Sequence, residues 1–366
     1  MSATTHRIAT FRRVAETLGF AALGGVTAGW LGMPAGYLSG AILAAGAAAL
    51  AGRPLLMPAL ATRVIFVVIG ISLGAVVTPE TLRGMASYPA SIAILIVAML
   101  CVSLGGAAYL FLVHRWRLLS AYLASSPGGM SQVLAVAAEL EADLRGVAIV
   151  QTLRVVVVAV GLPAGMALLG LAGQAVRRGN GLLNAATVDE LAILVALSTA
   201  VAIVAFRVRF PGGLLFGAMF ASGALHGSGL IHAVVPPWVG NAAMVALGGV
   251  IGARFANTPL RLLANYLGAA FGAIAVTVTI AGGFMLLLIH LMALPAPEVL
   301  IAYAPGSVDA IMLLALALNL DPVFIGAHHV MRIISVSIVI PLVARRLAQA
   351  PAGALRLPRK PPTFQD

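Results

Sequence analysis

Long apolar runs, separated by short polar or charged stretches, recur along the chain from Val14 to Leu347. Most are long enough to cross the hydrocarbon core of a membrane, which is about 30 Å thick. They lie at about 14–31, 35–51, 62–78, 89–113, 118–140 and 146–170, and again at about 188–206, 211–226, 239–254, 262–291, 297–318 and 323–344. The pattern predicts an all-α polytopic membrane protein.

Rare residues keep their spacing between the two halves of the chain. At one constant shift, Pro127, Gly128, Asp143, Arg154 and Pro163 recur as Pro305, Gly306, Asp321, Arg332 and Pro341, and Gly70, Gly74, Arg83 and Tyr88 recur as Gly248, Gly252, Arg261 and Tyr266. At a shift one residue shorter, 33–41 aligns with 210–218. Unrelated apolar runs would not keep these residues in register, so we infer an internal duplication.

The duplication divides the chain into five parts, namely an N-terminal tail (1–13), a first repeat (14–171), a linker (172–187), a second repeat (188–346) and a basic, Pro-rich tail (347–366). Neither tail is long enough to bury a hydrophobic core. The basic N-terminus followed by apolar sequence resembles a signal peptide, but we expect a retained helix because the matching segment of the second repeat lies mid-chain.

The fifth segment of each repeat contains a break in its apolar run. The breaks are Ser125-Ser126-Pro127-Gly128-Gly129 and Ala304-Pro305-Gly306-Ser307. Proline removes a backbone donor and glycine loosens the chain, so a continuous helix is not expected at either place. At membrane depth the freed backbone groups must face protein or a watery cavity. The alternative is a kink that only lets helices pack closely.

The distribution of basic loop residues indicates how the broken segments are arranged. If each broken segment enters and leaves the membrane on the same side, a larger share of the loop Lys and Arg residues lies on the cytoplasmic side than if each segment crosses. The positive-inside rule therefore favours the re-entrant arrangement. Each repeat then has five crossing helices plus one re-entrant segment, and the two repeats are inverted relative to each other. We expect both termini to be cytoplasmic. Inverted repeats with paired broken helices are typical of secondary transporters.

The first break could bind an anion. The half-helix that follows it begins at Met130, and free amides at a helix start attract negative charge. Ser125, Ser126, Ser131 and Gln132 could add side-chain hydrogen bonds. In the second repeat the matching positions are Tyr303, Ala304, Asp309 and Ala310, with Ser307 opposite Gly129.

Asp309 replaces Ser131 four residues after Pro305. A carboxylate at membrane depth is costly, so it marks a functional site, and we predict a proton or sodium coupling site there. The alternative is an aspartate that caps the helix after the Pro-Gly turn.

Arg154 and Arg332 occupy equivalent, deep positions in the last segment of each repeat. Gln151 precedes Arg154 by three residues, and His328 and His329 precede Arg332 by four and three, so each arginine shares a helix face with polar neighbours. Each arginine could bind the carbonyl groups freed by the neighbouring break. Alternatively, they could bind an anionic solute or pair with Asp309, and the sequence leaves both interpretations open.

Composition limits the other classes of function. Hydrophobic residues make up 61% and charged residues 9%, with a net charge of +11. The basic residues lie mainly in short loops, where they set topology rather than bind nucleic acid. Cys101 is the single cysteine, and the seven histidines are scattered apart from His328 and His329, so no metal site, catalytic residue or cofactor is predicted beyond a coupling proton or sodium ion. We expect that the protein is not an enzyme.

Small residues four apart recur on the second segment of each repeat, as Gly36 with Gly40 and Gly213 with Gly217. This spacing lets helices approach closely. It predicts packing within one chain, with a homodimer through the same helices as the alternative.

Ser126-Pro127-Gly128-Gly129 and Ala304-Pro305-Gly306, set in a duplicated module over about 12–346, resemble the AbrB family of bacterial membrane proteins. That family has been labelled both a regulator of gene expression and an ammonia monooxygenase, and it is unrelated to the small DNA-binding protein of the same name. The inverted architecture also resembles the cation/proton antiporter and anion transporter superfamily. That likeness implies that Asp309 and the two breaks form a transport site flanked by Arg154 and Arg332.

We therefore expect a secondary transporter or exporter of a small anionic solute, coupled to protons or sodium. The first alternative is a membrane protein that acts indirectly in the regulation of gene expression. The second is a membrane monooxygenase, for which the sequence offers no obvious metal ligands.

Overall fold

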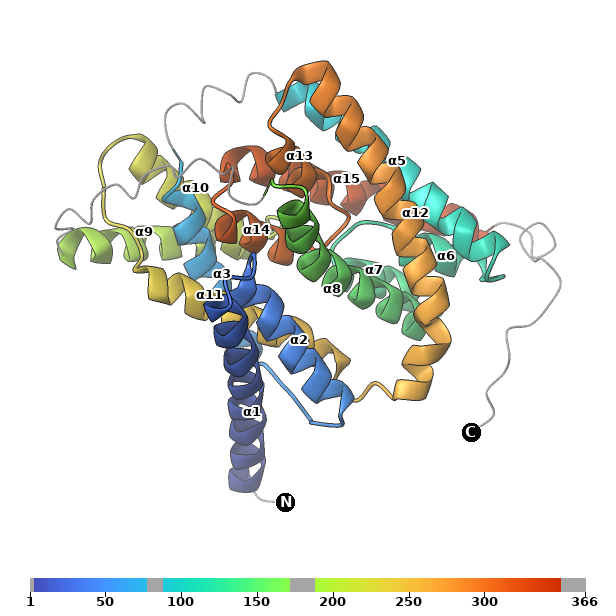
Figure 1. Cartoon of the computed structure of the whole chain (residues 1–366), viewed down its shortest axis with the longest axis horizontal. Helices are drawn as coiled ribbons and strands as arrows, with labels where there is room; N and C mark the ends of the chain where they lie inside the picture. The colour runs from blue at the N-terminus through green and yellow to red at the C-terminus, as the bar shows by residue number, and fades with distance from the viewer. Residues whose placement is uncertain (1–2, 78–87, 172–187, 350–366) are drawn as a thin grey trace.

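The computed structural model describes residues 3–77, 88–171 and 188–349, except for the side chains of residues 3–8 and of Ser131 (Figure 1). Every regular element in these ranges is a helix, which confirms the all-α prediction. The first half contains α1 (Ala3–Trp30), α2 (Gly36–Leu50), α3 (Ala59–Gly74), α5 (Tyr88–Leu112), α6 (Leu118–Ser125), α7 (Met130–Glu139) and α8 (Leu144–Leu168). The second contains α9 (Val188–Arg207), α10 (Gly213–Gly227), α11 (Pro237–Gly252), the short 3₁₀ helix η2 (Ala253–Phe255), α12 (Leu260–Met292), α13 (Ala296–Tyr303), α14 (Val308–Ala317) and α15 (Pro322–Gln349).

Six of the described helices are long and apolar enough to cross a membrane, namely α5, α8, α9, α11 with η2, α12 and α15. Others, such as α2, α3 and α10, are apolar but shorter. Their length and composition identify a polytopic membrane protein. The predicted linker 172–187, Arg83 and most of the C-terminal tail lie outside the described residues.

The order of helices in the second half repeats that in the first. In both halves the predicted fifth segment is divided into two short helices, α6 and α7 in one and α13 and α14 in the other. The extended linkers between them contain Pro127 and Pro305, at the breaks predicted from the sequence.

The two repeats exchange equivalent contacts. Gly70 of α3 packs so closely on α10 that an added Cβ would overlap the Leu215 carbonyl oxygen. Gly248 of α11, its counterpart, packs on α2, where a Cβ would lie 2.9 Å from the carbonyl oxygen of Leu38, the counterpart of Leu215. Helix α3 therefore meets α10 as α11 meets α2, which is the pattern of a pseudo-two-fold arrangement.

The small residues of α2 and α10 pack inside the chain. Gly40 lies against Gly24 and Ala28 of α1, and Gly217 lies against Ala202 of α9. The helix faces predicted from the Gly36/Gly40 and Gly213/Gly217 spacings are therefore covered by α1 and α9. A homodimer stays a prediction and would have to use another surface.

Gly40→Ala is expected to destabilise the fold, because the new methyl group would overlap the backbone of Gly24 and separate α1 from α2. Overpacking of this kind costs about 1–3 kcal/mol, measurable as a lower thermal midpoint of the purified protein in detergent. Gly161→Ala is the matched control, because nothing lies within 4 Å of a Cβ at that helical glycine. Equal midpoints for the two variants would contradict the close approach.

The helices pack into two groups. The first bundle contains α1, α2, α3, α9, α10 and α11, and the second contains α5 to α8 and α12 to α15. In Figure 1 the crossing pair α5 and α12 runs along the edge of the second bundle, away from α1 and α9. Between the bundles, α3 packs on α14 and α2 packs on α8, where Ser39 Oγ donates a hydrogen bond of 3.3 Å to the Ala159 carbonyl oxygen. Each bundle takes helices from both repeats.

Candidate functional site

Both breaks are buried inside the second bundle. Ser125 ends α6 and Ser126 continues in an extended conformation, while Tyr303 ends α13 and Ala304 is extended. Ser126 and Ala304 are each only 1% exposed. Their carbonyl groups can no longer accept helical hydrogen bonds, and burial without partners would be costly.

Arg154 of α8 supplies partners to the first break. Its Nη1 donates to the Ser125 carbonyl oxygen (3.0 Å), and its Nη2 donates to the Ser126 carbonyl oxygen (3.1 Å) and to Gln151 Oε1 (2.9 Å). Gln151 Nε2 in turn donates to the Leu123 carbonyl oxygen (2.9 Å) and, at 3.3 Å, to that of Ser126. A positive charge thus closes the C-terminal end of α6, where the helix dipole is negative.

Arg332 of α15 supplies a hydrogen-bond donor to the second break, as Arg154 does to the first. Its Nη1 donates to the Ala304 carbonyl oxygen (2.7 Å), and its Nη2 contacts His329 Nδ1. His329 therefore stands where Gln151 stands in the first repeat. Of the interpretations that the sequence left open, carbonyl binding by both arginines is the one the contacts support directly.

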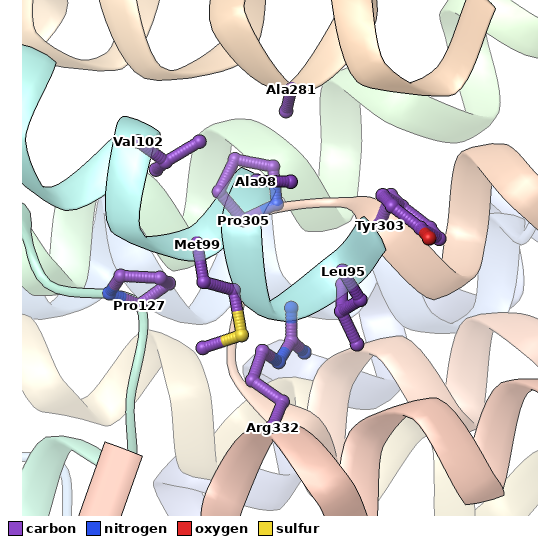
Figure 2. A pocket seen from close by; sticks show the side chains of 9 residues that line it. All are labelled: Leu95, Ala98, Met99, Val102, Pro127, Ala281, Tyr303, Pro305 and Arg332. Carbon is purple, nitrogen blue, oxygen red and sulfur yellow. The ribbon is translucent and has the colours of Figure 1, made fainter. Parts of the chain in front are cut away.

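A small cavity lies where the two breaks meet (Figure 2). Pro127 and Pro305 line it together with Arg332, and α5 and α12 border it. The remaining lining residues are Leu95, Ala98, Met99, Val102, Ala281 and Tyr303. Its volume is about 10 Å³, enough for about one water molecule. In this conformation the site is closed to any larger solute.

Positive charge concentrates around the breaks. Arg154 and Arg332 are 3% and 2% exposed, and they bind the carbonyl groups of the two breaks that meet at the cavity. The N-terminal ends of α7 and α14 start at the same two breaks and add partial positive charge. Within the described chain, the buried atoms Ser125 Oγ and Arg154 Nε have no hydrogen-bond partner. The arrangement can therefore accept an anion.

Asp309 lies half-buried in the first turn of α14, outside the lining of the cavity. It is not the helix cap, because Ser307 Oγ accepts the hydrogen bond from the Ala310 amide (3.4 Å). No salt bridge within 4.0 Å joins Asp309 to Arg154 or Arg332 in the described structure. A further buried arginine group lies in η2, where Arg254 Nη1 has no hydrogen-bond partner within the described chain.

Sequence reasoning missed Arg254 because a single arginine at the end of an apolar run looks like a topology-setting loop residue. Comparison of the matching positions in the two repeats could nevertheless have identified it. Arg254 has no charged counterpart in the first repeat, where Val76 occupies the matching position and Ser131 matches Asp309. Both charges are therefore present in the second repeat and absent from the matching positions of the first.

The other residues predicted at the first break, in the segment from Gly128 to Gln132, do not line the cavity. Gln132 Oε1 accepts from Ser337 Oγ (3.1 Å) and so ties α7 to α15. Gly128 packs on Val336 of α15, whereas nothing lies within 4 Å of a Cβ at Gly129. The Ser131 side chain lies outside the described residues.

His328 lies in a cluster of aromatic rings formed by Tyr88, Tyr303 and Phe324. Its Nδ1 donates to the Phe324 carbonyl oxygen (2.7 Å), so in the neutral ring Nε2 accepts from Ser91 Oγ (2.8 Å). Tyr303 donates to the Ser91 carbonyl oxygen. His328 does not line the cavity itself but packs on Tyr303, which does.

The described residues contain no group of three or more His, Cys, Asp or Glu side chains that could hold a metal ion. The recurring aspartates cap helices instead. Asp143 accepts from the Gly146 amide (3.0 Å) at the start of α8, and Asp321 accepts from the Val323 amide (2.8 Å) at the start of α15.

Two interrupted helices that meet at one buried, positively charged cavity define the class, which is an all-helical membrane protein with paired broken segments. The chain belongs to the AbrB family, because residues 37–348 match the family described as "Transition state regulatory protein AbrB". The chain is 28% identical to "Putative regulator AbrB" of Escherichia coli (strain K12) over 326 residues, covering 86% of this chain and 90% of that protein. It is 22% identical over 290 residues to "Uncharacterized protein YhjN" of Bacillus subtilis (strain 168), covering 75% of each.

Proposed function

We propose that the protein is a secondary transporter or exporter of a small anionic solute, coupled to protons or sodium ions. The observation that carries the proposal is the meeting of the two breaks at one cavity lined by Arg332, with Arg154 bound to the carbonyl groups of the first break. Anions bind where amides at helix starts and guanidinium groups converge. The proposal assigns no catalytic residue and no cofactor.

The arginines can bind a solute without abandoning the breaks. Arg154 Nε and Ser125 Oγ are buried and unpaired within the described structure, so they can accept an anion while Nη1 and Nη2 keep their carbonyl partners. An anion would also offset the buried positive charges of Arg154 and Arg332. A membrane protein that leaves positive charge buried without a counter-ion gains most when an anion enters.

Transport requires the closed cavity to open to each side in turn. The few contacts between the bundles, at α2 with α8 and α3 with α14, support a movement of one bundle against the other. We propose that the repeats are inverted across the inner membrane of a bacterium and that both termini are cytoplasmic. Single cysteines placed in a Cys101→Ala background should then be labelled from the same side at residues 2 and 360, and labelling from opposite sides would contradict the topology.

The proposal is tested by uptake into proteoliposomes. Purified protein is reconstituted, a pH or sodium gradient is imposed, and a panel of radiolabelled carboxylates, phosphate and sulfate is offered with protein-free vesicles as control. Uptake of at least one anion that disappears when the gradient is collapsed is the expected result. Uptake equal to that of protein-free vesicles for every anion under both gradients would contradict transport of an anionic solute.

A second candidate is indirect action in regulation, which the names of the family and of the Escherichia coli relative favour. A transported or retained solute would connect the membrane protein to gene expression. Loss of the chain would then change transcript levels, and the Asp309→Asn variant would reproduce the change. If transcript levels stayed normal in cells that carry the Asp309→Asn variant, the effect on gene expression would not depend on the transport proposed for this protein.

A further inference from the structure

A groove of about 460 Å³ lies on the first bundle, where α1, α2 and α11 meet. It shares no lining residue with the cavity at the breaks. One of its walls, α11 with η2, is long and apolar enough to cross a membrane. Leu18 and Val26 of α1 are exposed along the other wall. The groove therefore faces lipid, and its volume is typical of a site for a small ligand.

The two helices that form the walls run in opposite directions. A Cβ at Gly25 of α1 would lie 2.8 Å from the Val245 side chain, and a Cβ at Gly249 of α11 would lie 3.2 Å from the side chain of Ala21, earlier in α1. The start of α11 therefore lies beside the end of α1, and Trp238 is exposed there. Exposed tryptophans gather at the membrane interface, so this end of the groove lies at the level of the lipid headgroups.

The lining of the groove changes from polar to apolar along its length. Tyr37, Trp238 and Asn241 line the end at the interface, and within the described part of the chain no hydrogen bond joins their polar groups to the protein. Donors at the lipid boundary are costly without partners, and these three can donate to the ester and phosphate oxygens of a phospholipid. Farther into the membrane the lining is apolar, as at Leu18 and Ala246. The groove thus matches an amphipathic molecule.

The protein fills the equivalent place in the other half with its own side chains. There α3 packs on α9, as α11 packs on α1. Arg63 of α3 stands where α11 has Asn241. Its guanidinium lies 5.1 Å from the centre of the Phe206 ring, and Phe206 stands where α1 has Gly29. Three further positions carry larger residues in the other half, where Thr199, Val64 and Val68 replace Ala22, Ala242 and Ala246. Between α1 and α11 the same space is left open to another molecule.

We infer that this groove binds one acyl chain of a zwitterionic phospholipid, whose headgroup lies at the three polar side chains. Lipid tails are as apolar as the leucine and alanine side chains of the inner lining. The headgroup is net neutral, because residues 17–52 and 210–253, which supply α2 and most of both walls, contain no Asp, Glu, Lys or Arg. Anionic headgroups are recognised through clustered basic residues instead. The inference does not depend on the proposed transport.

The occupant is tested by native mass spectrometry of the detergent-purified protein with equal amounts of phosphatidylethanolamine and phosphatidylglycerol. The parent should retain one phosphatidylethanolamine per chain. The groove-filling variant Ala242→Val/Ala246→Val should retain about tenfold less, because its added methyl groups occupy the space of the acyl chain. The control Ala196→Val/Ala200→Val adds the same groups to the exposed face of α9 and should retain the lipid as the parent does.

A second variant tests the polar end of the groove without filling it. Asn241→Leu removes the amide that meets the headgroup, so retention should fall about fivefold. Equal retention by the groove-filling variant and its control would overturn the inference, as would a preference of the parent for phosphatidylglycerol. A dimer that the parent forms and the groove-filling variant does not would also overturn it, because a second copy of the chain would then occupy the groove.

Discussion

Arg154→Met is expected to lower the free energy of unfolding by about 3 kcal/mol, because the Ser125 carbonyl oxygen loses its charged donor and that of Ser126 keeps only the longer bond from Gln151. Methionine fills similar space, so the loss comes from the unpaired carbonyl groups and not from a cavity. The measurement is the urea or thermal transition of the purified protein. Arg154→Lys should fall between the parent and Arg154→Met, because it keeps the charge but has fewer donors.

The control for this prediction is Arg345→Met. Arg345 forms a salt bridge of 3.1 Å with Glu139, but both side chains are more than half exposed. Exposed pairs contribute about 0–1 kcal/mol, so this variant should unfold close to the parent. If Arg154→Met were as stable as Arg345→Met, the carbonyl groups of the first break would not depend on Arg154.

Arg332→Gln is expected to raise the half-saturating solute concentration of uptake by about 10- to 100-fold, using whichever anion the proteoliposome panel identifies. Arg332 lines the cavity, and a hydrogen bond from a charged group contributes about 1.5–3 kcal/mol. The Ala304 carbonyl oxygen keeps its hydrogen bond from the Gly306 amide (2.9 Å), which limits the structural damage. Arg332→Lys keeps the charge and should lose less.

An unchanged half-saturating concentration in Arg332→Gln would show that the solute does not bind near this guanidinium. A folded variant is required for that conclusion, so its thermal midpoint must be measured beside the flux. A variant that unfolds at the assay temperature is replaced by Arg332→Lys, whose half-saturating concentration should still exceed that of the parent.

The sequence predicted the breaks because proline and glycine act locally. Pro127 and Pro305, each followed directly by glycine, interrupt their helices where the residues indicated, whereas Pro163 and Pro341, with no adjacent glycine, lie inside α8 and α15. The positions of Arg154 and Arg332 followed from their depth in an apolar run, since a buried charge needs partners nearby. Those partners are carbonyl groups that the breaks had freed.

Packing between distant helices could not be predicted in the same way. Apolar runs show that a helix is buried but not which helix covers it, so the exchange of α3 and α11 between the repeats became visible only in the structure. His328 was grouped with Arg332 by its spacing of four residues, yet its ring turns to Ser91 and Phe324. Arg254 escaped notice because a single arginine at the end of an apolar run looks like a topology-setting loop residue.

Asp309 is proposed to couple a cation to the movement of an anion through the site at the breaks. Gradient-driven uptake by Asp309→Asn tests this role, beside the parent and Asp189→Asn, a control that removes an exposed acid in the first turn of α9. Asp309→Asn should lose the gradient-dependent part of uptake by about 100-fold while Asp189→Asn retains it, with both proteins folded. Uptake by Asp309→Asn that still follows the pH or sodium gradient as in the parent would contradict a coupling role for Asp309.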